Sequence, residues 1–173
     1  MSTGRGLIKT VKTIAREVLI TVLLALVIFM AIRTIAYNFE VSGQSMEPNL
    51  HHGQFVMISK IAYWFDEPGR GDIVVYYSDR VQHHVIHRIV GLPGETIAVR
   101  NGRVYINGQV LDEPYIQDGS RTIPAQHVPD NKYYIVGDNR DAASWELVPE
   151  DNIVGKAWMT YWPLSEWGSV PNY

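Results

Sequence analysis

The chain of 173 residues has no cysteine. Disulfide bonds, zinc–thiolate sites and thiol nucleophiles are therefore excluded, while the redox compartment stays open. The chain also lacks an excess of basic residues, because 15 lysines and arginines stand against 18 acidic residues and the net charge is −3. Binding to nucleic acid relies on a positive surface, so no nucleic-acid partner is expected.

What the chain does have is one uncharged apolar run near the amino terminus, from Val18 to Ile32. Residues 34–37 extend it to the roughly 20 residues that a helix needs to cross a bilayer. A cleaved signal sequence would have a shorter apolar run, and a buried core helix would show polar residues at helical spacing, whereas only Thr21 is polar between Val18 and Ile32. We therefore expect a retained transmembrane anchor that contacts the lipid bilayer.

The distribution of charge gives this anchor an orientation. Residues 1–36 hold five of the basic residues and one of the acidic residues, and four of those five precede the apolar run. The positive-inside rule then places the amino terminus in the cytoplasm. We predict a basic cytoplasmic tail at residues 1–16, an anchor at 17–37 and an extracytoplasmic domain at 38–173, held in the cell membrane as a single-pass protein.

Beyond Glu40, short runs of valine, isoleucine and tyrosine alternate with glycine, proline, asparagine and aspartate, as is typical of β-strands joined by turns. Asn101-Gly102 lies between two alternating apolar segments, which is a strong hairpin signal. The prediction is a mostly β fold, a small antiparallel sheet domain or partly open barrel preceded by one transmembrane α-helix. The expected strands lie near residues 55–61, 73–77, 83–90, 96–106, 132–136 and 153–162.

The segment Val41–Pro48 contains two serines around a glycine, and such a turn can expose a hydroxyl and backbone N–H groups for acyl transfer. Ser-Gly-x-Ser is also common turn chemistry, so the pattern alone leaves both interpretations open. A serine nucleophile needs a base, and the nearby candidates are Lys60, His83, His84 and His87. Histidine can work without a large pKa change. A histidine pair on a strand is a weak metal signal, and no metal or cofactor is expected.

Four motifs in this order resemble the type I signal peptidase family. Ser42–Pro48 resembles its nucleophile segment, placed directly after the anchor as in that family. The other matches are residues 70–75, residues 88–95, and Gly137-Asp138-Asn139-Arg140 followed by Ser144. The resemblance implies a membrane-bound serine endopeptidase that removes signal peptides from exported preproteins, with Ser45 as nucleophile. It also implies cleavage after small residues.

His87 departs from part of that family. The bacterial branch has a lysine base at this place, whereas the microsomal and archaeal branch has histidine. We therefore expect His87 to be the general base, and a catalytic imidazole is usually oriented by a carboxylate. Asp138 and Glu146 are the candidates for that orienting acid.

The remaining site residues also follow from the resemblance. The Ser45 backbone N–H and the Ser42 hydroxyl are expected to form the oxyanion hole. Asn139, Arg140 and Ser144 are interpreted as supports of the site. The substrate is expected to lie extended along a strand edge.

Other functions stay open at this point. The chain could be a non-catalytic membrane-tethered β module that binds extended peptides or a translocon partner, in which case Ser45 and His87 would be dispensable. It could also be a self-cleaving serine protein, with Ala142-Ala143-Ser144 or Pro124-Ala125 as cut sites. The enzyme reading is preferred, with preprotein signal peptides as substrates and the secretion translocon as a further candidate partner.

Overall fold

A computed structural model of the chain describes residues 3–116, 119–171 and 173. It falls into two compact units, Met1–Ala36 and Tyr37–Tyr173, each of which is described by itself. The first unit holds α1 (Thr3–Ile35), and within it the 24 residues Lys12–Ile35 are long and apolar enough to cross a membrane. The Thr21 hydroxyl donates to the Glu17 carbonyl at 2.9 Å. The helix thus satisfies this polar group internally, as an apolar environment requires.

The second unit is built from strands, which confirms the mostly β prediction. Two short 3-10 helices, η1 (Glu150–Asn152) and η2 (Leu164–Glu166), complete the regular structure of its described residues. The strands are β1 (Ala36–Glu40), β2 (Phe55–Ser59), β3 (Ile73–Ser78), β4 (His83–Gly91), β5 (Thr96–Arg100), β6 (Arg103–Ile106), β7 (Gln109–Val110), β8 (Ile123–His127), β9 (Lys132–Val136), β10 (Trp145–Pro149), β11 (Ile153–Trp162) and β12 (Gly168–Ser169).

The larger sheet has the strand order β1-β2-β11-β3-β4-β9-β10, and β12 pairs with β11. The pairs β2–β11, β11–β3, β3–β4, β4–β9 and β9–β10 are all antiparallel. The late strand β11 is therefore inserted between two early ones. Strands β3 and β4 lie next to each other near the middle of the sheet.

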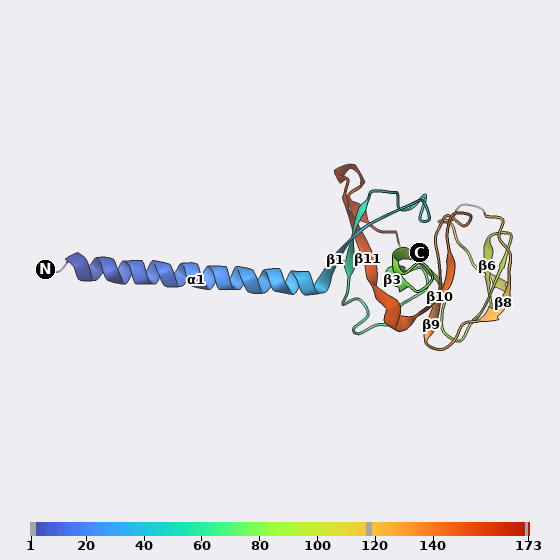
Figure 1. The fold of residues 1–173 in the computed structure, drawn as a ribbon, viewed down its shortest axis with the longest axis horizontal. Helices are drawn as coiled ribbons and strands as arrows, with labels where there is room; N and C mark the ends of the chain where they lie inside the picture. The colour runs from blue at the N-terminus through green and yellow to red at the C-terminus, as the bar shows by residue number, and fades with distance from the viewer. Residues whose placement is uncertain (1–2, 117–118, 172) are drawn as a thin grey trace. The chain divides into compact units, whose positions relative to one another are not determined.

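The smaller sheet has the order β7-β6-β5-β8. Its hairpin β5–β6 turns at Asn101 and Gly102, whose φ angles are 48° and 77°. Two successive positive φ angles are what a two-residue hairpin turn needs, so the predicted hairpin is confirmed. In Figure 1, β6 and β8 lie on the side of the domain that carries β9 and β10.

The larger sheet has a core on each face, because successive side chains of a strand point to opposite faces. Ile73, Val75 and Ile86 belong to one core cluster, and Val74, Tyr76 and Ile89 belong to another. A third cluster joins β4, β9 and β10 to the smaller sheet. The sequence disfavours parallel α/β architecture, and the pairs β2–β11, β11–β3, β3–β4, β4–β9 and β9–β10 are antiparallel.

Candidate active site

Ser45 lies in the loop that joins β1 to β2. The Val41 N–H donates to the Gln54 carbonyl at 2.8 Å and the Gly53 N–H donates to the Val41 carbonyl at 2.9 Å, which close the base of this loop. Met46, the residue after Ser45, is fully buried in the core with Leu50. Burial of a side chain of this size contributes about 1.5–3 kcal/mol. The loop is therefore fixed on both sides of the serine, whose own side chain stays half-buried.

His87 lies in the middle of β4, and its Nε2 is 3.0 Å from the Ser45 Oγ. The imidazole is 2% exposed. Burial lowers the pKa of His87 to about 3, because desolvation disfavours the charged ring. The ring is thus neutral at neutral pH, and a neutral imidazole can accept a proton from a serine hydroxyl.

The second ring nitrogen of His87 contacts a tyrosine. The Tyr76 hydroxyl lies 3.0 Å from Nδ1 and 3.5 Å from Glu146 Oε2. The Ser78 hydroxyl donates to the same Glu146 carboxylate at 2.8 Å. Glu146, one of the two acids predicted from the sequence, is therefore connected to His87 through Tyr76. Sequence reasoning missed Tyr76, because its strand reads as an ordinary apolar core segment.

Asp138, the other predicted orienting acid, has different partners. Arg88 Nε and Nη2 donate to its two carboxylate oxygens, each at 2.8 Å. Asn49 Nδ2 donates to the same carboxylate at 2.9 Å. Within the described residues the Asp138 carboxylate does not reach His87. Both members of the Asp138–Arg88 ion pair are fully buried, so the pair holds β4 to the segment that follows β9.

The segment 137–144 packs directly on the serine loop. The Asn139 N–H donates to the Ser45 carbonyl at 3.0 Å. A Cβ placed on Gly137 would lie 2.2 Å from that carbonyl oxygen, so only glycine allows this approach. The Asn139 backbone therefore holds the loop that carries Ser45.

Arg140 and Ser144, the other two predicted supports, make different contacts. Arg140 is fully buried, and its Nη1 donates to Glu113 Oε2 at 3.1 Å and to the Gly102 carbonyl at 3.2 Å. It therefore ties this segment to the smaller sheet. Ser144 lies beside Tyr76, whose phenolic pKa its hydroxyl lowers against the larger effects of burial and Glu146.

A cavity of about 440 Å³ opens beside Ser45 and His87. Ser42, the predicted oxyanion residue, lines it and also lines a smaller adjoining cavity of about 190 Å³ together with Ser45. Within the described part of the chain, the Ser45 backbone N–H has no hydrogen-bond acceptor. The other lining side chains of the larger cavity include Arg80, His83, Arg121, Asp141 and Ser144.

Of the other base candidates, His83 lines both cavities beside Ser45 and His84 lines the smaller one, but the contacts of these side chains are made with other groups. Lys60 Nζ sits 5.5 Å from the centre of the Tyr37 ring, and His84 packs against Tyr37 and Tyr77. His83 is exposed, and its Nδ1 lies 2.9 Å from the Val81 carbonyl oxygen. Of the four candidates, His87 is the one whose ring nitrogen is hydrogen-bonded to Ser45 in the described structure.

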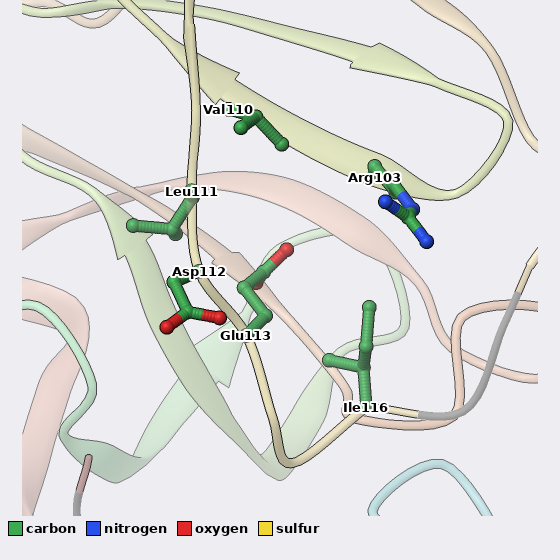
Figure 2. A pocket seen from close by; sticks show the side chains of 6 residues that line it. All are labelled: Arg103, Val110, Leu111, Asp112, Glu113 and Ile116. Carbon is green, nitrogen blue, oxygen red and sulfur yellow. The ribbon is translucent and has the colours of Figure 1, made fainter.

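A second cavity of about 430 Å³ lies in the region of the smaller sheet, and Figure 2 shows the six side chains that line it. They come from Arg103 and the segment Val110–Ile116. Its volume is close to the 440 Å³ of the cavity at Ser45, so volume does not identify the functional site. None of these six described residues carries a hydroxyl or an imidazole, and the Glu113 carboxylate is already paired with Arg140.

Among the described residues, no group of three or more histidine, aspartate or glutamate side chains could hold a metal ion. In this site a serine hydroxyl is hydrogen-bonded to a buried neutral imidazole, and the backbone N–H of the same serine is free within the described structure. This is the arrangement of a serine hydrolase.

Comparison with known proteins narrows this class. Residues 13–162 match the family described as signal peptidase, peptidase S26. The signal peptidase I of Leptolyngbya laminosa is 37% identical over 170 residues, which cover 88% of this chain and 84% of that protein. The signal peptidase I S of Bacillus subtilis (strain 168) is 35% identical over 175 residues, or 91% of this chain and 92% of that protein.

A solved signal peptidase I from Enterococcus faecalis V583 is 27% identical and covers 53% of this chain and 97% of its own, with a TM-score of 0.42. The family match spans most of the sequence, and both curated relatives exceed 30% identity over most of their length. The chain belongs to the signal peptidase family, peptidase S26. The resemblance inferred from its four motifs is confirmed.

Proposed function

We propose that this chain is a membrane-bound signal peptidase that hydrolyses the bond between signal peptide and mature region of exported preproteins. Its membership of the family and the names of its relatives support the substrate class. The observation that carries the mechanism is the 3.0 Å contact between Ser45 Oγ and His87 Nε2.

In this mechanism Ser45 attacks the scissile carbonyl while His87 Nε2 takes its proton. The imidazolium then protonates the leaving amine, and water resolves the acyl-enzyme with His87 again acting as base. The free Ser45 N–H and the Ser42 hydroxyl stabilise the oxyanion. Loss of one such donor typically lowers kcat by about 10²–10³.

The orientation in the membrane forms part of the proposal. The basic residues before the apolar run keep the amino terminus in the cytoplasm, so the domain after the anchor works on the extracytoplasmic side. An extended preprotein segment would bind along a strand edge beside the cavity.

The test is cleavage of a preprotein in detergent by the full chain and by Ser45→Ala, His87→Ala and Ser42→Ala. We expect cleavage after a small residue, no activity in the first two variants and a reduced kcat in the third. His127→Ala is the matched control, because this exposed histidine lies on β8 of the smaller sheet. Full activity of His87→Ala would assign the base to another group, and a wild type inert on several preproteins would favour the non-catalytic peptide-binding module.

A further inference from the structure

Only one of the two neutral forms of His87 can act as the base. Nε2 faces Ser45, so this nitrogen must be unprotonated in order to accept the serine proton. The ring hydrogen must then sit on Nδ1. Which form is present depends on the hydrogen bond that Nδ1 makes.

The hydrogen bond between Nδ1 and its partner does not by itself fix which atom donates. The Tyr76 hydroxyl lies 3.0 Å from Nδ1, and a phenol can donate one hydrogen or accept. If Tyr76 donated to Nδ1, the ring hydrogen would move to Nε2 and the Ser45 proton would have no acceptor. The site works only if the Tyr76 hydrogen points to another group.

Glu146 is that group. The strand register places Tyr76 and Ser78 of β3 on the same sheet face as His87 of β4, and the pairs Ile89–Ile135 and Ile135–Glu146 place Glu146 on this face too. An ionised carboxylate only accepts hydrogen bonds, and it attracts a hydroxyl hydrogen more strongly than a neutral nitrogen does. The Glu146 Oε2 atom lies 3.5 Å from the Tyr76 hydroxyl oxygen, which is longer than the 3.0 Å between that oxygen and His87 Nδ1. The Ser78 hydroxyl donates to the same carboxylate at 2.8 Å and holds it in place.

We propose that Tyr76 and Glu146 are positioning residues that set the tautomer of His87. Tyr76 donates its hydrogen to Glu146 and accepts one from Nδ1–H, which leaves Nε2 free for Ser45. This inference rests on the proposed function of the Ser45–His87 pair. It adds the two residues that keep His87 Nε2 unprotonated and so able to accept the Ser45 proton.

The same arrangement stabilises the charge that forms during the reaction. When His87 takes the Ser45 proton, both ring nitrogens carry hydrogen and the ring becomes positive in a buried site, where charge is costly. The negative Glu146 acts on that charge through the polarised Tyr76 hydroxyl. Tyr76 keeps its own proton, because burial and then Glu146 raise its pKa above the ordinary value, with Ser144 and Arg80 acting in the opposite direction.

The experiment combines ¹⁵N NMR of the histidine rings with cleavage kinetics, both on the full chain in detergent. The ¹⁵N shifts show which ring nitrogen of His87 carries the hydrogen, whether or not the protein cleaves anything. In the wild type we expect hydrogen on Nδ1. In Glu146→Gln the amide can donate to the Tyr76 oxygen, which turns the Tyr76 hydrogen to Nδ1, so we expect the ring hydrogen on Nε2.

Kinetics should follow the tautomer. For Glu146→Gln we expect a fall in kcat on the order of 10²-fold or more with little change in KM, as for loss of general-base catalysis. Tyr76→Phe should also lower kcat, since it removes the acceptor of Nδ1–H. Tyr77→Phe is the matched control, because its hydroxyl contacts the exposed Gln82 on the other face, and it should keep the wild-type kcat.

The outcomes separate this proposal from the proposed function. Hydrogen on Nε2 in the wild type overturns the inference, and so does an unchanged tautomer with unchanged kcat in Glu146→Gln. A wild type that has hydrogen on Nδ1 but does not cleave preproteins leaves the positioning intact and refutes the proposed function. The wild-type spectrum keeps the test decisive even if a variant fails to fold.

Discussion

Burial of His87 predicts an unusual response of activity to acid. At pH 5 an imidazole with the ordinary pKa of about 6.5 would be neutral in roughly 3% of molecules. Burial lowers the pKa of His87 to about 3. At the same pH a group with that pKa is neutral in roughly 99% of molecules, so the proposed base stays able to accept a proton.

The assay is kcat/KM for preprotein cleavage between about pH 4 and pH 8, because this ratio reports the ionisation of the free enzyme. We expect its acid limb well below pH 6.5. Other titratable groups near the site are Glu146, linked through Tyr76, and His83 and Asp141, which line the cavity. Repeating the profile with His83→Gln separates an effect of substrate binding from titration of His87. An acid limb near pH 6.5 that survives this substitution would refute the reasoning.

The same burial has a consequence for stability, and its sign follows from proton binding. Below pH 6.5 the unfolded chain takes up a proton at His87 that the folded chain does not, so the free energy of unfolding falls as the pH drops from 6.5 towards 3. Above pH 6.5 the imidazole of His87 is neutral in both states, so it adds no pH dependence to the free energy of unfolding. Urea unfolding should show a smaller decline over that range in His87→Gln than in the wild type.

Three further predictions concern the packing around the site and the apolar helix. Gly137→Ala should strongly reduce cleavage, because its Cβ would lie 2.2 Å from the Ser45 carbonyl oxygen, and an unchanged kcat would contradict the close approach. Asp138→Asn should lower the free energy of unfolding by about 3–5 kcal/mol in urea titration, since it leaves Arg88 buried without its counter-charge, whereas the exposed Asp141→Asn should change it little. A chain that begins at Tyr37 should fold, because residues 37–173 form a separate compact unit, and it should stay in the supernatant when membranes are pelleted. If this shortened chain pelleted with the membranes as the full chain does, the helix would not be the anchor.

Much of this architecture could be predicted from local patterns. The apolar run, the Asn101-Gly102 turn and the alternating strands depend on neighbours in the sequence, and each lies where the pattern indicated. Strands β1, β7, β8, β10 and β12 were not predicted. Their residues carry weak patterns, and pairing with other strands makes them extended.

The candidate site was predictable where a motif names the residue, but not where a distant partner decides its role. Asp138 and Glu146 looked equivalent in sequence as orienting acids. The buried Arg88 takes the carboxylate of Asp138, and this pairing depends on the packing of β4 against the segment after β9. Tyr76 gains its place next to His87 from the β3–β4 register, which no short motif encodes.

The position of β11 has a consequence for how the protein is made. Strand β11 separates β2 from β3 in the sheet, although β2 ends at Ser59 and β3 at Ser78, long before β11 ends at Trp162. A nascent chain that stops before the start of β11 therefore has β2, which follows the Ser45 loop, and β3, which pairs with the His87 strand, without the strand that lies between them. Such distant pairing is slow to form. We expect the newly made protein to be inert until β11 has paired with both β2 and β3.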